Sequence, residues 1–202
     1  MQKIPTLFVR NPEDMRRVLR DVTPGCEWVP DGEGQATRKW DGTCVMLDEH
    51  GAWWARREVK PDRTSPTGYR PVQHDEITGK TVGWEPMEQS AFARIHAEAV
   101  NTMGHLAAGT YELIGPKINR NSDEYTDHVL LRHGWAPLSV RTDCATAPRD
   151  FEGLQQWLTA RPYEGIVWHH PDGRMAKLKA RDFTARHVIT APDPEPTSRA
   201  SS

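Results

Sequence analysis

The sequence predicts one α+β domain built mainly on antiparallel sheet. Its 202 residues suit a single domain of ordinary size. Residues 163–170 and 174–179 alternate between apolar and polar side chains on either side of Pro171-Asp172-Gly173, which is typical of an antiparallel hairpin. Residues 85–104 instead place apolar side chains at helical spacing and end at a glycine. Hairpins and helices in one short chain indicate the α+β class.

Composition narrows the functional classes. A net charge of −2 with 27% charged residues excludes a globally basic nucleic-acid coat but permits a local cationic groove. No apolar stretch approaches the length of a membrane span, so we expect neither export nor membrane insertion. The chain has three widely spaced cysteines, and none has the spacing of a metal site. This argues against a disulfide framework or a structural zinc site and indicates a protein of the reducing cytoplasm.

Helix-capping residues and residues that interrupt regular structure predict the helices and the long loop. Residues 10–21 resemble a helix with Asn11 as N-cap and proline at its first position. Residues 60–80 are polar, contain three prolines and are expected to form a long substrate-facing loop. Residues 150–160 are predicted as a helix capped by Asp150.

Apolar or alternating runs predict the remaining strands. These runs are residues 35–40, 43–48, 52–58, 109–115, 128–134 and 138–140. The last dozen residues, 191–202, are rich in proline and serine and are expected to be disordered, which leaves residues 1–190 as the folded domain.

The stretch RKWDGTCVM, residues 38–46, is the first candidate site. In a strand Lys39 and Asp41 point to the same side, while Gly42 allows a tight turn or a close approach of another group. A lysine becomes a nucleophile when it loses its proton, which neighbouring cations promote. Taken alone, however, this short pattern fits a surface salt bridge better than a catalytic site.

Four residues from later strands add to this pattern. Glu112 lies in YELIG, Glu164 precedes a glycine and an apolar strand, and Lys177 and Lys179 share one strand face. Two carboxylates can hold a sugar hydroxyl and a hydrated divalent metal, and two lysines can neutralise a phosphate during transfer. Solubility of an exposed strand is the alternative for all four. It is weaker for the acids, because burial of a carboxylate without a partner costs several kcal/mol.

The ordered set KWDG, WWARRE, YELIG, EGIVW and KLK resembles the motif series of the covalent nucleotidyltransferase superfamily. This superfamily contains ATP-dependent polynucleotide ligases and GTP-dependent mRNA capping enzymes. The small size and the stretch ELIGPKINRN are most similar to compact single-domain RNA ligases, which join 5′-phosphate to 3′-hydroxyl ends. The resemblance covers residues 38–183 and implies an ATP-grasp-like catalytic domain of antiparallel sheets flanked by helices. Too few residues follow Lys179 for an OB-fold.

The resemblance also implies roles for the phosphate-binding residues. Lys39 attacks the α-phosphate of ATP and becomes lysyl-AMP, while Asp41 and Gly42 shape the turn that presents it. Lys177 and Lys179 contact the α-phosphate and assist the departure of pyrophosphate.

For the sugar, metal and base, the resemblance points to strand residues. Glu112 binds the ribose hydroxyls, and Glu164 acts near Mg²⁺ or Mn²⁺, so that these two carboxylates are the metal candidates. Val167 packs against one face of the base, and its neighbour Ile166 belongs to the core. Trp40 and the segment 128–134 are candidates for the other face.

The cationic positions are less clearly matched. Either Arg56 or Arg57 fits the contact with ribose or nucleic-acid phosphate, and Arg57 is favoured, with Lys60 assisting. Neighbouring strand residues face opposite sides, so the other arginine is expected to be a solvated surface charge. Lys117 and Arg120, together with the loop 60–80, are candidates for holding RNA.

Other readings remain open. DNA nick sealing and guanylyl transfer use the same lysine chemistry, and a nucleotide-binding or RNA-end-binding module, or a donor of adenylyl groups to other proteins, would keep the pocket without ligating. His169 and His170 are read as surface or turn residues, since neighbours on a strand cannot both bind one ion. His74-Asp75-Glu76 is read as a solvated loop, and Cys44 as a small core residue.

Overall fold

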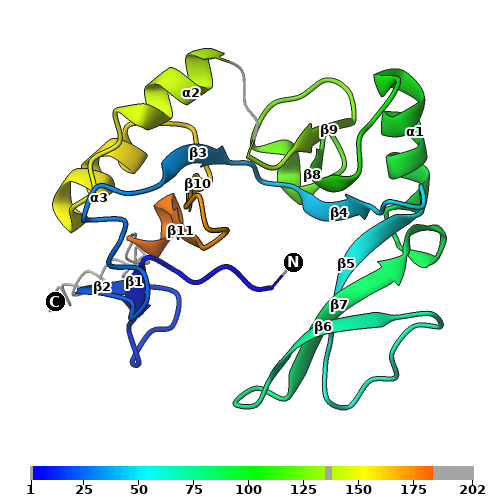
Figure 1. Cartoon of the computed structure of the whole chain (residues 1–202), viewed down its shortest axis with the longest axis horizontal. Helices are drawn as coiled ribbons and strands as arrows, with labels where there is room; N and C mark the ends of the chain where they lie inside the picture. The colour runs from blue at the N-terminus through cyan, green and yellow to red at the C-terminus, as the bar shows by residue number, and fades with distance from the viewer. Residues whose placement is uncertain (1, 135–137, 184–202) are drawn as a thin grey trace, which may run out of the picture.

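Two antiparallel sheets form most of the protein, as Figure 1 shows for a computed structural model that describes residues 2–134 and 138–183. The small sheet has the strand order β11 (Met175–Lys179), β10 (Gly165–His169), β3 (Gln35–Lys39). The large sheet has the order β6 (Arg70–Asp75), β7 (Lys80–Pro86), β5 (Trp53–Val59), β4 (Thr43–Leu47), β8 (Gly109–Ile114), β9 (Val129–Arg132). A hairpin of β1 (Phe8–Arg10) and β2 (Val18–Val22) completes the strands of the described part. The expected α+β class is therefore confirmed.

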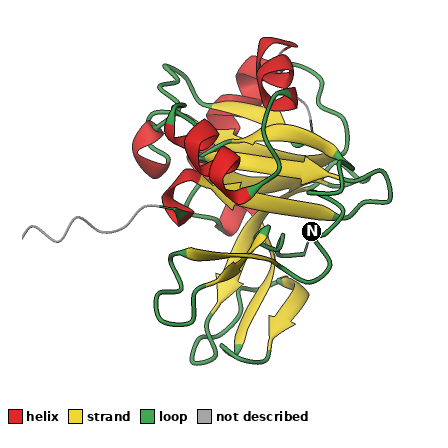
Figure 2. Ribbon diagram, turned by 90° about the vertical axis from the view of Figure 1, so that its left-hand side faces the viewer, coloured by secondary structure: helices red, strands yellow, loops and turns green. Residues whose placement is uncertain are grey.

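Helices cover one side of each sheet. In Figure 2 they gather around one half of the molecule, and the strands around β6 and β7 extend away from them. The α-helices of the described ranges are α1 (Ala93–Met103), α2 (Leu138–Ala145) and α3 (Phe151–Thr159), and short 3₁₀ turns lie at Met87–Gln89, Asn119–Asn121 and Ala180–Asp182. Asp150 caps α3 as predicted, because its side chain accepts a hydrogen bond of 2.8 Å from the Gly153 amide.

The buried side chains divide into two hydrophobic clusters. Ile95 and Ala99 of α1 pack with Val45 and Leu113 of the large sheet. The second cluster joins the small sheet to α3 and to the β1–β2 hairpin, with Ile166, Trp168, Leu178, Leu154 and Phe8 among its members. Each sheet therefore has its own apolar face, and the opposite faces remain for a site between them.

Strand alternation decides which side chains of the small sheet reach that site. Ile166 and Leu178 are fully buried in the core cluster, so their neighbours in sequence must point to the other face. In the register of the sheet, Gly165 lies opposite both Lys39 and Lys179. One row across the three strands thus places the two lysines on either side of a residue that has no side chain.

The segment Trp40–Gly42 connects the two sheets. β3 ends at Lys39 in the small sheet, and β4 begins at Thr43 in the large one (Figure 1). Gly42 lies so close to β8 that an added Cβ would come 2.4 Å from the Leu113 carbonyl oxygen and 2.7 Å from Cγ of Glu112. Glycine at this position therefore allows the strand of Glu112 to approach the end of the Lys39 strand.

The prediction of a helix at residues 10–21 was wrong. This segment forms the end of β1, a turn and most of β2, with Phe8 opposite Val22 and Arg10 opposite Val18. Asn11 does not cap a helix, because its side chain accepts a hydrogen bond from the Glu13 amide in a local turn. The apolar residues supposed to share a helix face separate instead, with Val18 buried and Met15 exposed.

Two further predictions need correction. The supposed loop 60–80 contains β6, whose Pro71 is tolerated because β6 is an edge strand and its pairing with β7 is irregular at that point. The apolar run 138–140 is the first turn of α2 rather than part of the sheet. The expected disordered tail, residues 191–202, lies outside the described residues. Within those residues no helix is long and apolar enough to cross a bilayer.

Candidate functional site

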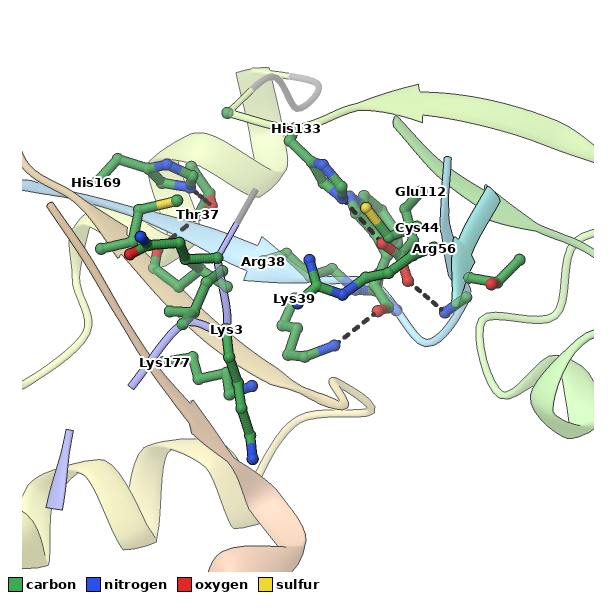
Figure 3. A pocket seen from close by; sticks show the side chains of 18 of the residues that line it. Lys3, Thr37, Arg38, Lys39, Cys44, Arg56, Glu112, His133, His169 and Lys177 are labelled. Atoms are coloured by element: carbon green, nitrogen blue, oxygen red, sulfur yellow. Dashed lines mark hydrogen bonds and ion pairs between the residues drawn. The ribbon is translucent and has the colours of Figure 1, made fainter. Parts of the chain in front are cut away.

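A cavity of about 400 Å³ lies between the two sheets (Figure 3). Residues of β3, β10 and β11 line one wall, and residues of β4, β5 and β8 line the other. The segment after β9 and residues 2–4 at the start of the chain complete the lining. The volume falls in the range of small-ligand pockets.

Glu164 joins two lysines at the end of the small sheet. Its carboxylate accepts a hydrogen bond of 2.5 Å from Nζ of Lys179 and forms an ion pair with Nζ of Lys39. The three side chains are largely buried, with Glu164 only 11% exposed. Burial alone would raise the pKa of Glu164, but the two ammonium groups outweigh it and hold the pKa below its usual value. Glu164 is therefore a carboxylate, and it fixes the position of the Lys39 amine.

Lys177 lies two residues from Lys179 on the same strand face and lines the cavity. Burial, together with the charges of Lys179 and Lys39, lowers its pKa to about 8. Lys39 and Lys179 pair with Glu164, and the third amine, Lys177, lies close enough to feel their charges, so positive charge is in excess here. A bound anion such as a phosphate would relieve that repulsion.

Glu112 faces the cavity from the other sheet. One of its oxygens accepts a hydrogen bond of 3.2 Å from the Gly42 amide, and the other lies 2.9 Å from Nε2 of His133. The second ring nitrogen of His133 is 3.0 Å from the Thr110 hydroxyl. Glu112 is 9% exposed, so these partners offset the cost of burying it and hold its carboxylate at the cavity.

The loop between β8 and β9 holds the Trp40–Gly42 connection. Asp123 accepts a hydrogen bond of 3.0 Å from the Asp41 amide, and Ser122 donates one of 2.8 Å to the Asp41 carboxylate. Asn119 donates to the Gly42 carbonyl at 2.7 Å. Asp41 thus binds the loop and does not line the cavity.

Arg38 is used for structure at the same place. Its guanidinium lies between the rings of Trp40 and Tyr163, at 4.2 and 4.4 Å from their centroids, and forms an ion pair with Asp123. Trp40 is 7% exposed and lines the cavity. The Arg38 guanidinium therefore covers one face of the Trp40 ring, and a ligand could contact Trp40 only from the cavity.

The two residues expected near the base point to opposite faces of β10, as strand alternation requires. Val167 lines the cavity, and Ile166 is fully buried in the core. Of the two neighbouring arginines, Arg56 lines the cavity, whereas Arg57 is directed elsewhere, 3.9 Å from Glu85 and 53% exposed. Sequence alternation separated this pair correctly but did not tell which member faced the site.

The other predicted cations lie away from the cavity. Lys60 lines a separate depression together with Arg57. Lys117 and Arg120 are exposed on the loop between β8 and β9, and neither lines the cavity. Arg120 has a backbone φ of +67°, which side-chain-bearing residues adopt uncommonly.

Among the polar residues that line the cavity, Lys3, Thr37 and His169 were not singled out from the sequence, whereas His133 belongs to the candidate segment 128–134. The surface assignment of His169 needs correction: its Nε2 lies 2.9 Å from the Thr37 hydroxyl, and burial together with the charge of His133 lowers its pKa. His169 could have been found, since it is two residues from Val167 in β10. Lys3 gave no such signal, because nothing in its sequence context predicts where the first residues lie.

A divalent ion would find few protein ligands here. Within the described ranges no three His, Cys, Asp or Glu side chains gather to hold a metal. Both oxygens of Glu164 are engaged by ammonium groups, and both oxygens of Glu112 have partners. Within the described residues the cavity therefore offers no ready-made set of protein ligands for a metal.

A scan against protein-family models matches no family, and a search of curated proteins finds no matching relative.

Proposed function

We propose that the protein is an ATP-dependent RNA ligase that joins 5′-phosphate and 3′-hydroxyl ends through lysyl-AMP on Lys39. One observation carries the proposal: Lys39 and Lys177 line one wall of a nucleotide-sized cavity, Glu112 lines the other, and Glu164 pairs with Lys39 and Lys179 beside it. The nucleotidyltransferase fold and its ATP-grasp-like architecture belong to the same proposal. The antiparallel sheets on both sides of the cavity support it.

In the first step the deprotonated Nζ of Lys39 attacks the α-phosphorus of ATP. A nitrogen–phosphorus bond forms, the bond to the bridging oxygen breaks, pyrophosphate leaves and the proton of Nζ passes to solvent. Glu164 holds Nζ in place before attack. Lys177 and Lys179 donate hydrogen bonds to the phosphate oxygens as negative charge develops on them.

The cavity walls hold the rest of the nucleotide. Glu112 accepts hydrogen bonds from the ribose hydroxyls, Val167 packs on one face of the base, and Trp40 borders the other. Arg56 replaces Arg57 as the cation near the ribose or phosphate, because Arg56 lines the cavity. Mg²⁺ or Mn²⁺ accompanies the triphosphate as part of the substrate and neutralises its charge, with Glu164 and Glu112 reaching it through water.

In the later steps AMP passes from Lys39 to the 5′-phosphate of RNA, and a 3′-hydroxyl then attacks the activated end and releases AMP. Each step exchanges one phosphorus bond for another, so no further reactant is needed. The proposal assigns the reaction to the cytoplasm, in keeping with three cysteines that are all free thiols.

Label transfer tests the proposal and separates its alternatives. The native chain, incubated with α-labelled ATP and Mg²⁺, should acquire a covalent label that survives denaturing electrophoresis, and α-labelled GTP should give none. The labelled protein should then seal 5′-phosphorylated RNA. Transfer from GTP would indicate a guanylyltransferase, sealing only of nicked DNA a DNA ligase, and label on other proteins a protein adenylyl donor. Absence of any label would leave a binding module.

A further inference from the structure

A second hollow adjoins the cavity on the side of the small sheet. It has a volume of about 840 Å³ and lies between β11, the β1–β2 hairpin and the beginning of the chain. Lys3, Ile4 and Lys177 line both the cavity and this hollow, so the two adjoin. We call it the second groove. Figure 1 shows the β1–β2 hairpin beside β11, with the first residues of the chain running toward the large sheet.

The second groove concentrates positive charge in a protein whose formal net charge is −2. Its lining contains six basic side chains and two carboxylates. Two more carboxylates, Asp75 and Glu164, pair with Lys3 and Lys179 from outside the lining, so six bases face four acids. The basic residues are Lys3, Arg10, Arg16, Lys177, Lys179 and Arg181. Such a stripe next to the site of phosphate chemistry favours a polyanion.

Ion pairs with Asp75, Asp182, Asp14 and Glu164 offset part of this charge, but several of the paired bases stay exposed. Asp182 is 3% exposed and holds Arg10 at 2.8 Å, which fixes one guanidinium in the wall of the groove. Asp14 accepts from Arg16 at 2.8 Å, but Arg16 remains 63% exposed. Lys3 is 59% exposed. Exposed positive charge is therefore present both near the cavity, at Lys3, and at the far end of the groove, at Arg16.

The chemistry of the lining indicates which part of a polyanion is bound. Among the described residues that line the groove, none is aromatic, and its apolar surface comes mainly from Ile4, Pro5 and Met15. Bases would find no ring on which to stack, whereas phosphates would find amines and guanidinium groups. The groove has about twice the volume of the cavity, and its charge extends to the hairpin. Pyrophosphate would occupy only the end at Lys177, but a polynucleotide strand would span the groove.

We propose that the second groove binds the phosphate backbone at the 5′ end of an RNA strand, so that its terminal phosphate reaches the AMP on Lys39 from the side of Lys177 and Lys179. This inference rests on the proposed function for its direction, though strand binding can be measured without catalysis. It differs from the expectation that Lys117 and Arg120 hold the RNA, since those residues lie on another loop.

The test compares two charge-matched double variants of the full chain. Arg16→Glu with Arg181→Glu reverses two exposed side chains of the groove, neither of which lines the cavity. Arg20→Glu with Arg174→Glu reverses two exposed arginines outside it. Fluorescence anisotropy with a labelled, 5′-phosphorylated RNA of about a dozen nucleotides gives the affinity over a range of salt concentrations. Circular dichroism and thermal melting check that both variants fold.

We expect the groove variant to bind RNA at least about tenfold more weakly, with the slope of log K against log salt reduced by about 0.7 per lost contact. The control variant should bind within about twofold of the native chain, and both should still form the AMP adduct. Equal RNA affinity in the two variants would overturn the inference. A loss of adduct formation with unchanged RNA affinity would also overturn it, because the groove would then serve the pyrophosphate of ATP. Weakened RNA binding in a chain that never forms the adduct would uphold the groove and refute the ligase proposal.

Discussion

Replacing Glu164 with glutamine should destabilise the protein, because it leaves two buried ammonium groups facing each other. Removal of one partner from a buried ion pair costs about 3–5 kcal/mol. The side chains of Glu164, Lys39 and Lys179 are 11, 20 and 16% exposed, so solvent reaches them slightly and reduces this cost. We therefore expect a loss of about 2–4 kcal/mol in the free energy of unfolding.

Guanidinium denaturation at neutral pH measures this loss, and Glu98→Gln provides the control. Glu98 pairs with Arg94 one turn away on α1, lies 3.1 Å from Nδ1 of His128 and is 44% exposed. Glutamine keeps an amide group for the ring, so the replacement should cost only about 0.5 kcal/mol. A difference below about 1 kcal/mol between Glu164→Gln and the native chain would refute the buried-pair reasoning.

The pH dependence of that difference follows from the lowered pKa of Glu164. The carboxylate contributes its stability fully above the ordinary glutamate pKa of 4.5 and loses it as the pH falls through the lower pKa of the folded state. The gap between the native chain and Glu164→Gln should therefore be constant near neutral pH and shrink below pH 4.5. A gap that widened in acid would contradict the assignment.

Three other substitutions test the site. Lys177→Met should raise the free energy of unfolding by about 1–3 kcal/mol at neutral pH, because it removes a buried charge, and it should abolish adduct formation. In thermal melts at increasing pH this gain should fade between the folded pKa of about 8 and the ordinary value of 10.5, where the lysine becomes neutral in both states. Gly42→Ala should cost about 2–3 kcal/mol in denaturant, since its Cβ would lie 2.4 Å from the Leu113 carbonyl oxygen; a cost near zero would show that β8 can move aside. Arg56→Gln should weaken ATP binding about tenfold by calorimetry while Arg57→Gln leaves it unchanged, and the reverse result would restore the assignment made from sequence.

Strand periodicity explains what the sequence could predict. Lys177 and Lys179 had to share a face because they are two residues apart in a strand, and the turn at Pro171-Asp172-Gly173 fixed the hairpin that brings them near Glu164. The family resemblance placed Val167 at the nucleotide, and the same alternation then put Ile166 on the opposite face; Val167 lines the cavity and Ile166 is buried in the core. These features depend on the local geometry of strands and turns, which can be predicted from neighbouring residues in the sequence.

Features that depend on contacts between distant segments were not predictable. Residues 10–21 have the cap and spacing of a helix, yet pairing of Phe8 with Val22 and burial of Val18 favour a hairpin. The choice between Arg56 and Arg57 depended on which face of β5 turned toward the small sheet. His133 lies next to Glu112 because β9 pairs with β8. No sequence pattern near His133 predicts that pairing.

The central claim is that the Lys39 amine takes AMP from ATP, and intact-mass measurement tests it most directly. The native chain and Lys39→Ala are each incubated with ATP and Mg²⁺, and the modified residue is located by peptide mapping. We predict a gain of one AMP on the native chain, mapped to Lys39, and none on the variant. An unchanged native mass, or an adduct that persists on Lys39→Ala, would contradict the account.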